Sequence, residues 1–435
     1  MHLMTLRPRI VIVGGGFGGL ETAKALAEKD VDVTLVDQQN HHCFQPLLYQ
    51  VATAALSPAD IAWPIRSILK GQSNTTVLMA EVTGIDTSAR TVSASGRQIP
   101  YDYLVIATGA THSYFGHDEW QDAAPGLKRI EDATHIRRRT LLAFERAEFS
   151  TDEAEKQRLM TFAIVGGGPT GVEMAGAISE VAGRILPADF RHVDPRTARV
   201  VLIEAGPRIL PAFPEDLSAY AHRSLEDMGV EVMVNTRVTG CDDGGVDLGD
   251  RRLETGCTIW AAGVVASPAG KWLQAPTDRA GRIEVRDDLT VPGHQEIFAI
   301  GDTASIKQAN GTPVPGIAPA AKQMGQHAAA EIIGRLNGKA PTAFTYRHQG
   351  DLATIGRKSA IVKLKRTKLT GFPAWLFWSL IHVYFLIGLR YRIGVAWKWA
   401  WDYLSVQRGA RLITRSVKDE PPTAHKNGAS HDAAA

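Results

Sequence analysis

VIVGGGFGGLETAKAL at residues 11–26 and AIVGGGPTGVEMAGAI at residues 163–178 are the two stretches of sequence that decide the fold. Three spaced glycines in the first stretch recur 152 residues later in the second, as Gly14, Gly16 and Gly19, then Gly166, Gly168 and Gly171. Each copy follows an apolar strand-like run and opens a helix-like run, which is the context of a dinucleotide-binding loop. Two such loops predict that two dinucleotides meet in one protein, which favours an electron-transfer function.

The spacing of the glycines in each loop has a physical reason. The first glycine permits a tight strand-to-helix turn, the second lets the backbone approach a pyrophosphate, and the third allows close packing of helix and strand. A second apolar strand follows each loop and ends in an acid, Asp37 or Glu204, which is expected to bind ribose hydroxyls. Asp37 lies 23 residues after Gly14, whereas Glu204 lies 38 after Gly166, so the second unit contains an insertion at about residues 179–196.

Length and cysteine content narrow the class of protein. At 435 residues the chain is expected to form two or three domains. Its three cysteines, Cys43, Cys241 and Cys257, are far apart and have neither metal-ligand nor CxxC spacing. That pattern favours a reducing compartment and predicts no metal site. The first strand begins by Ile10, which leaves no room for a signal peptide, so the cytoplasmic side is the expected location.

The repeat extends beyond the glycine loops. The strand-like segment YDYLVIATGA, near Gly109, has a counterpart in CTIWAAGVVA, near Gly263, and these segments are 154 residues apart. A polar, helix-prone segment at residues 120–160 is expected to link the two copies. The later segment EIFAIGDTASI contains a buried strand that ends at Gly301 and Asp302, and we predict that this strand returns to the first unit and completes it.

The C-terminal end differs in composition from the rest of the chain. Residues 357–418 carry 13 Lys or Arg residues against one acid, together with five of the nine tryptophans. Residues 371–389 are almost entirely apolar but short for a membrane span. The apolar residues of the next segment share one helical face: Ile393, Trp397, Trp401 and Leu404. This pattern predicts helices that lie on an anionic lipid surface. A dimer interface is the alternative, and one pair of helices can serve both roles.

Several motifs, taken in order, resemble the type II NADH dehydrogenases, single-subunit, non-proton-pumping NADH:quinone oxidoreductases of the two-dinucleotide-binding-domain flavoprotein superfamily. The motifs are GGGFGG with Asp37, FQPLLYQVA at 44–52, ATG at 107–109, GGGPTGVE at 166–173, IEAGPRILP at 203–211, AIGD at 299–302 and the Trp-rich C-terminus. The resemblance covers about residues 8–415. It implies bound FAD, NADH as a transient co-substrate, and a membrane quinone such as ubiquinone as the electron acceptor in a respiratory chain.

The implied fold class is α/β, with two Rossmann-like dinucleotide-binding domains and a C-terminal membrane-binding region of amphipathic helices. The expected divisions are a first part of the FAD-binding domain at 1–118, the NADH-binding domain at 119–285, the completing part of the FAD-binding domain at 286–340, a membrane-anchoring and dimerisation region at 341–415, and a disordered tail at 416–435. We expect a homodimer on the cytoplasmic face of the cell membrane, and no nucleic-acid partner.

Carried over residue by residue, the resemblance implies two nucleotide sites. The residues expected to hold FAD are Gly14, Gly16, Gly19, Asp37, Thr108, Gly109 and Asp302. Those expected to hold NADH are Gly166, Gly168, Gly171, Glu204 and Gly263. The carboxylate of Glu204 would repel a 2′-phosphate, which favours NADH over NADPH, although Arg208 nearby could soften this preference.

Glu173 follows the third glycine of the second loop. In the family, a glutamate at this point faces the nicotinamide and the flavin and is proposed to help proton transfer to quinone, and that catalytic role is implied here. Burial between two cofactors would raise the pKa of the carboxyl, which suits a proton relay. The alternative is an acid in the first helical turn that interacts favourably with the helix dipole.

The quinone motif of the family, AQxAxQ, is only partly present. The sequence APAAKQ at 318–323 keeps both framing alanines and the second glutamine, but Pro319 replaces the first glutamine. Because proline has no side-chain amide, any hydrogen bond to a quinone carbonyl must come from elsewhere. The candidates are Gln323, which is also assigned a catalytic role, Lys322, Gln45 and Gln50.

Other functions of the same fold are the alternatives. An NADH peroxidase or oxidase would use one redox cysteine, and Cys43 is the candidate, although relatives usually carry an aliphatic residue there and packing is favoured. Disulfide reductases and sulfide:quinone oxidoreductases need several cysteines beside the flavin, which this sequence lacks. A membrane redox sensor that binds FAD without turnover is the remaining alternative, and loss of quinone access through Pro319 would fit it.

Overall fold

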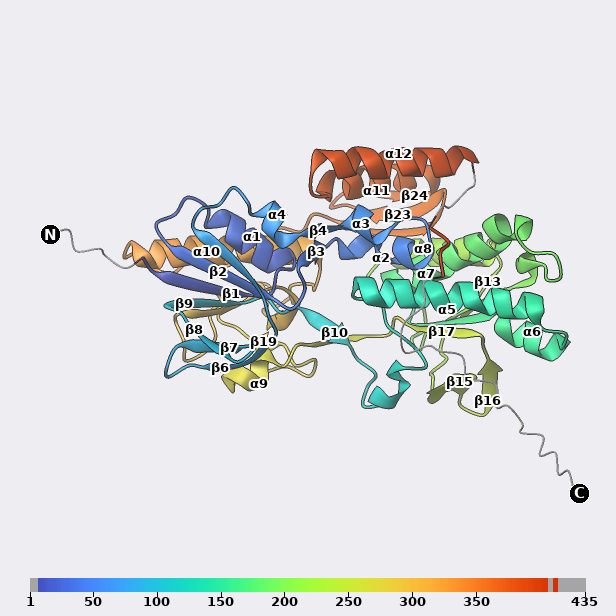
Figure 1. Ribbon diagram of the computed structural model, residues 1–435, viewed down its shortest axis with the longest axis horizontal. Coiled ribbons are helices and arrows are strands. Elements are labelled where there is room, and N and C mark those ends of the chain that lie inside the picture. Colours follow the sequence, from blue (N-terminus) through green and yellow to red (C-terminus); the bar gives the residue numbers. More distant parts are fainter. Residues whose placement is uncertain (1–6, 406–409, 414–435) are drawn as a thin grey trace, which may run out of the picture.

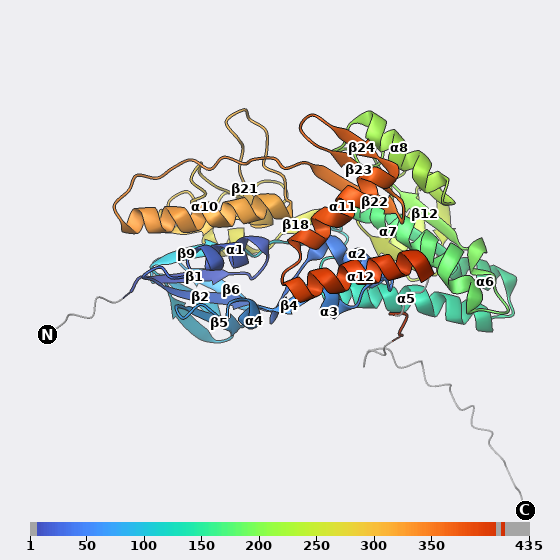
Figure 2. The same ribbon diagram turned by 90° about the horizontal axis from the view of Figure 1, so that it is seen from above.

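Two α/β units lie side by side along the long axis of the molecule. Two C-terminal helices begin near the place where the units meet and lie over the second unit (Figure 1, Figure 2). The computed structural model describes residues 7–405 and 410–413, without the side chains of Tyr403 and Leu404. The predicted tail at 416–435 and the predicted apolar contact of Leu404 therefore lie outside the described residues. The predicted domain boundaries stay predictions.

The first unit is built on a parallel five-stranded sheet in the order β20-β9-β1-β2-β5. The strands are β1 (Arg9–Val13), β2 (Asp32–Asp37), β5 (Thr75–Met79), β9 (Tyr103–Ile106) and β20 (Ile297–Ala299). The parallel pairing of β20 with β9 confirms that the chain returns to the first unit. As a result, the ends of β1, β9 and β20 meet at one edge, where Gly14, Gly109 and Asp302 follow them.

Both faces of this sheet are covered, so β1 is apolar along its whole length. Its alternate residues Ile10 and Ile12 face α1 (Phe17–Ala25) and α10 (Ala318–Leu336). Val11 and Val13 face an antiparallel meander and α9 (Ala269–Leu273) on the other side. The meander strands are β6 (Val82–Asp86), β7 (Thr91–Ala94) and β8 (Arg97–Pro100).

The second unit repeats this plan with a parallel four-stranded sheet in the order β13-β12-β11-β17. Its strands are β11 (Thr161–Val165), β12 (Arg199–Ile203), β13 (Val230–Met233) and β17 (Cys257–Trp260). One face packs against helices α5 (Ile130–Phe149), α7 (Pro169–Glu180) and α8 (Glu215–Glu226). The other face packs against a second meander of β14 (Gly240–Asp242), β15 (Gly245–Leu248) and β16 (Arg251–Glu254). An antiparallel pair joins the two units: β10 (Ala110–His112), labelled in Figure 1, and β18 (Val264–Ala266), labelled in Figure 2.

Two segments differ from their sequence-based description. The stretch at 40–61 looks rich in loops, yet it forms β3 (His41–Cys43), α2 (Leu48–Ala52) and α3 (Pro58–Ile61), followed by β4 (Ala62–Pro64) and α4 (Ile65–Ile68). These short elements are stabilised because their apolar residues are buried against α5. This is a long-range contact that the local sequence does not reveal. The linking segment at 120–160 is helical as predicted, but it forms two helices, α5 and α6 (Glu153–Leu159).

The C-terminal region begins with a sheet that the sequence did not indicate. Strands β22 (Asp351–Gly356), β23 (Ser359–Lys363) and β24 (Lys368–Thr370) form an antiparallel sheet that packs on α7 and α8. Helices α11 (Gly371–Phe385) and α12 (Leu389–Ser405) follow. Within residues 7–405 and 410–413, no helix combines the length and the apolar character that crossing a bilayer requires.

Candidate active site

The two glycine loops have the same backbone geometry. Gly14 has φ +105° and Gly166 has φ +110°, a region that residues with a side chain rarely adopt. A Cβ at Gly14 would overlap the Ala107 carbonyl, and one at Gly166 would overlap the Ala261 backbone, at the ends of the neighbouring strands β9 and β17. The repeat seen in the sequence is therefore a repeat of structure.

The acid at the end of each second strand binds its own glycine loop. Asp37 accepts hydrogen bonds from the backbone N–H groups of Gly15 at 2.5 Å and Gln39 at 2.6 Å. Glu204 accepts the corresponding bonds from Gly167 and Gly206, both at 2.6 Å. Burial raises the pKa of Asp37, and its two backbone hydrogen bonds oppose that rise. Both predicted ribose ligands thus lie beside their loops.

The surroundings of both loops fit a dinucleotide. Gly16 and Gly168 are the N-cap residues of α1 and α7 and have no side chain to cap the first-turn N–H groups. A Cβ at either position would meet no atom within 4 Å, so the backbone is open to a ligand at the positive end of each helix. Free donors beside open space are the arrangement that a pyrophosphate requires. FAD and NADH are thus compatible with the residues present.

The remaining predicted nucleotide residues follow the strands β9, β17 and β20. The Thr108 hydroxyl is 2.5 Å from that of Ser267 and 3.1 Å from that of Thr303, which in turn donates to the Gly109 carbonyl at 3.3 Å. Asp302 lies on the turn after β20, where its half-buried carboxyl approaches Gly316. Gly263, the last of the glycines predicted to hold NADH, has φ +98° and follows β17.

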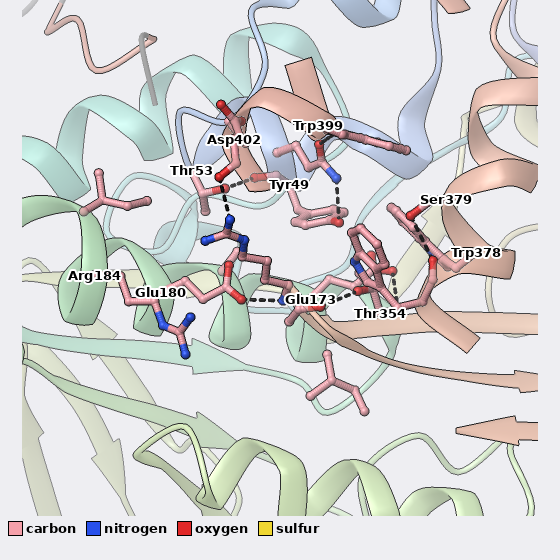
Figure 3. A pocket seen from close by; sticks show the side chains of 18 residues that line it. Tyr49, Thr53, Glu173, Glu180, Arg184, Thr354, Trp378, Ser379, Trp399 and Asp402 are labelled. Atoms are coloured by element: carbon pink, nitrogen blue, oxygen red, sulfur yellow. Dashed lines mark hydrogen bonds between the residues drawn. The ribbon is translucent and has the colours of Figure 1, made fainter. Parts of the chain in front are cut away.

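Glu173 lines a pocket enclosed by α2, α7, β22, α11 and α12, here named the Glu173 pocket (Figure 3). The wall consists mainly of aromatic and polar side chains, among them Tyr49, Gln50, Thr354, Trp378, Ser379 and Trp399. Glu173 is the fifth residue of α7, so it lies beyond the first turn, and its Oε1 accepts a long hydrogen bond of 3.4 Å from the Thr354 N–H. The helix-dipole alternative therefore does not describe this residue. Desolvation raises the pKa of the Glu173 carboxyl to about 8, which the Thr354 hydrogen bond only partly opposes.

The raised pKa of Glu173 predicts that the protein loses stability as the pH rises. Between the ordinary pKa of 4.5 and the folded value of about 8, the folded chain binds more protons than the unfolded chain. The free energy of unfolding therefore falls as the pH rises through this window. Glu173→Gln removes the titrating group, so its Tm should exceed that of the wild type by several degrees more at pH 8.5 than at pH 5. Thermal unfolding at both pH values checks this, and an unchanged difference between the two proteins would contradict it.

The four predicted quinone ligands occupy different environments. Gln50 lines the Glu173 pocket, where it accepts a hydrogen bond from Trp399 Nε1 at 2.8 Å and donates to the Tyr49 hydroxyl at 2.9 Å. Gln45 is exposed and donates to the Lys128 carbonyl at 3.3 Å. The structure therefore brings Gln50, and not Gln45, to the same pocket as Glu173.

Gln323 and Lys322 lie on α10, outside the wall of the Glu173 pocket. The Gln323 amide donates to the Arg347 carbonyl at 3.0 Å and accepts from the Arg347 N–H at 2.9 Å, so its predicted roles would require this pair to open. The Lys322 ammonium lies 5.6 Å from the ring centroid of Phe17 and 4.7 Å from that of Phe385. Desolvation lowers its pKa. Lys322 thus links the first glycine loop to α11, and the roles of both residues stay predictions.

An aromatic contact chain, which we did not predict, joins the first glycine loop to the C-terminal helices. Phe17 packs edge-on against Phe44, with 5.9 Å between the ring centroids. Phe44 packs in the same way against His382, with 6.1 Å between the centroids. His382 stacks on Trp378 at 4.0 Å, and burial lowers the pKa of this histidine to about 4. The only sequence signal for this chain was the clustering of tryptophans after residue 371, which we interpreted as membrane contact.

The cysteine alternative fits the structure poorly. Cys43 lies at the end of β3 and packs against the apolar core. Burial, together with the charge of Glu131, raises the pKa of its thiol to about 12. A redox thiol needs the opposite, a lowered pKa and an electropositive surrounding. Packing is therefore the role that the geometry supports for Cys43.

Comparison with known proteins first defines the class. The profile of the pyridine nucleotide-disulphide oxidoreductase family matches residues 8–325. NDH2 from Plasmodium falciparum, solved in complex with NADH, superposes with a TM-score of 0.85 over 94% of this chain and 100% of that chain, at 21% sequence identity. The paired glycine loops and the shared fold thus place the chain in this class.

Closer relatives then define the family. Type II NADH:quinone oxidoreductase NdhA of Mycobacterium tuberculosis is 45% identical over 94% of this chain and 90% of its own length. The type II NADH:quinone oxidoreductase of Staphylococcus haemolyticus is 32% identical over 85% of this chain and 92% of its own length. The chain belongs to the type II NADH:quinone oxidoreductase family.

Proposed function

We propose that the chain oxidises NADH bound at the second glycine loop and delivers two electrons to a quinone whose headgroup lies in the Glu173 pocket. FAD, when bound at the first loop, supplies the two-electron chemistry. The observation that carries the proposal is the position of Glu173. It lies on the helix that begins at the second glycine loop, and it lines a pocket that extends to the C-terminal helices. One side chain therefore lies between the nucleotide site and the surface from which a quinone would enter.

In this proposal the chain's own residues position the reactants and handle protons. The uncapped N-termini of α1 and α7 hold the two pyrophosphates. The aromatic rings of Tyr49, Trp378 and Trp399 offer flat faces to a quinone ring and exclude water from it. Glu173, with a pKa near 8, holds a proton at neutral pH and is placed to donate it to a reduced quinone oxygen.

We also propose that α11 and α12 bind the membrane surface. Each helix exposes four large apolar side chains at intervals of four residues, and together these form the α11–α12 stripe. Its members are Phe372, Leu376, Leu380 and Tyr384 on α11, and Leu389, Ile393, Trp397 and Trp401 on α12. These side chains are 47–71% exposed, and large apolar side chains gathered on a surface mark an interaction site. Basic residues of the region favour the anionic cytoplasmic leaflet. The alternative is that a second copy of the chain packs against this stripe in a dimer.

Anaerobic stopped-flow absorbance tests the proposed activity. NADH should bleach the flavin absorbance, and a water-soluble quinone added afterwards should restore it rapidly. Restoration by peroxide or oxygen alone would instead indicate a peroxidase or an oxidase. The same experiment with a long-chain quinone in vesicles tests whether electrons reach a membrane acceptor.

Glu204 is expected to set the preference for NADH. Arg208, which could soften this preference, donates to the carbonyls of Phe213 at 2.8 Å and Pro211 at 3.0 Å. Glu204→Gln removes the charge that repels a 2′-phosphate. The ratio of kcat/KM for NADH to that for NADPH should fall about tenfold, since a like-charge contact costs at least about 1.4 kcal/mol. Glu231→Gln, on a neighbouring strand of the same sheet, is the control, and an equal fall in both variants would contradict the assignment.

A further inference from the structure

Arg137, on α5, is a buried cation without a counter-charge. Only 7% of its surface is exposed, and its Nε has no hydrogen-bond acceptor. In the part of the chain that the structure describes, residues 7–405 and 410–413, Arg137 forms no ion pair either. Burial lowers its pKa, and no neighbouring acid opposes that effect. An unpaired charge at a buried position is costly and guanidinium keeps its proton, so an anion from outside the described residues would stabilise Arg137.

Arg137 faces a groove between α12 and the body of the protein, here named the α12 groove. The groove has a volume of about 1220 Å³ and is walled by α3, α5, the turns that follow α7, and α12. Arg184 also lines the groove, from a π-helical turn (Val181–Ile185) within the insertion predicted at 179–196. Such turns inside helices are frequent at functional sites.

The other cations of the α12 groove are already neutralised. Lys398 pairs with Asp60 at 2.6 Å, and Arg411 pairs with Asp189. By contrast, the Arg184 side chain makes no hydrogen bond or ion pair with any residue for which the structure gives a position. Apart from Asp189, the described lining includes one carboxylate, that of Asp402, against the two guanidinium groups of Arg137 and Arg184. The groove therefore has an excess of positive charge.

The α12 groove opens at the surface that we assign to the membrane. Trp397 and Trp401 line it and belong to the α11–α12 stripe, with exposures of 68% and 54%. Indole rings favour the headgroup level of a bilayer. Arg184 also lines the Glu173 pocket, where Figure 3 places it on the same side as Glu180. The groove thus combines a phosphate-binding charge, an apolar edge and continuity with the Glu173 pocket.

We propose that the α12 groove binds the headgroup of an anionic phospholipid, with its phosphate between Arg137 and Arg184 and its acyl chains beside Trp397 and Trp401. The proposal rests on the membrane docking of α11 and α12. Paired guanidinium groups match the geometry of a phosphate oxyanion. A lipid in this groove would lie beside the entrance of the Glu173 pocket and form part of the quinone's path.

Titration of the purified flavoprotein with dihexanoyl phosphatidylglycerol, below its micellar concentration, tests the site. Tryptophan fluorescence reports binding, since two tryptophans line the groove. Dihexanoyl phosphatidylcholine and inorganic phosphate are the comparison ligands. We expect the anionic lipid to bind at least tenfold more tightly than either, and Arg184→Gln and Arg137→Met each to weaken its binding at least tenfold. Arg390→Gln, an exposed cation of α12 outside the groove, should not change it.

Thermal unfolding separates a binding role of Arg137 from a structural one. Because Arg137→Met removes an unpaired buried charge, its Tm without lipid should equal or exceed that of the wild type, and the anionic lipid should raise only the wild-type Tm. Equal binding of inorganic phosphate would overturn the lipid assignment in favour of a free-anion site. Binding that appears only after Asp419→Asn and Glu420→Gln would show that the chain's own tail fills the groove. If the wild-type protein sediments with neutral vesicles but does not bind the short-chain anionic lipid, the proposed site is wrong. The proposal that α11 and α12 bind the membrane surface would still stand.

Discussion

Replacing Glu173 by glutamine is expected to leave the bleaching of flavin absorbance by NADH fast and to slow its recovery with quinone about 100-fold. Glutamine has nearly the same shape and can still accept the Thr354 hydrogen bond, so the pocket should keep its form. It cannot release a proton, which a carboxyl with a pKa near 8 can do at neutral pH. Stopped-flow measurement of the two half-reactions distinguishes binding from proton transfer.

Glu21→Gln is the matched control. Glu21 stands two residues after Gly19, as Glu173 stands two residues after Gly171, so the repeat provides an equivalent glutamate outside the pocket. Its carboxyl accepts a hydrogen bond from Gln326 at 2.7 Å on α10. Both half-reactions should be unchanged in this variant. Slowing of both half-reactions by Glu173→Gln would indicate damage to the nucleotide site and contradict the proton role.

The geometry of the two glycine loops was predictable because it depends on local rules. A glycine with positive φ, a bare N-cap and an acid at the next strand end lie within about 40 residues of one another, and the chain contains the set twice. The return of β20 was predictable for the same reason, since a repeated unit lacking one strand calls for another. Residue type and spacing therefore predicted the loops, and the incomplete repeat predicted the returning strand.

The Glu173 pocket could not be derived in this way because five segments far apart in the sequence build it. Gln50, Glu173, Thr354, Trp378 and Trp399 come from α2, α7, β22, α11 and α12. The short elements at 40–61 and the sheet β22–β24 position these residues, and both owe their form to tertiary packing.

Gln323 illustrates the same limit. A sequence motif predicts that Gln323 binds quinone. In the structure, the oxygen and the nitrogen of its side-chain amide are both hydrogen-bonded to the backbone of Arg347, 24 residues away.

Serine substitution of Leu376, Leu380, Leu389 and Ile393 is expected to lower the partition of the protein onto vesicles on the order of 10³-fold. Four aliphatic side chains contribute roughly 1 kcal/mol each at a lipid surface, about 4 kcal/mol in total. All four are at least 47% exposed and none lines the Glu173 pocket or the α12 groove. Vesicle sedimentation measures the partition, and NADH-dependent bleaching of the flavin should be unaffected.

Point substitutions test the surface more cleanly than removal of both helices. The opposite faces of α11 and α12 are buried, with Trp378 2% and Val395 1% exposed, so truncation would also open the Glu173 pocket. Met79→Ser with Phe149→Ser, which remove exposed apolar side chains elsewhere, should leave vesicle binding intact. If the quadruple variant still binds vesicles but a dimer dissociates in sedimentation velocity, a second copy of the chain covers the stripe. The lipid surface is then reached by another route, because both partners cannot bury the same eight side chains.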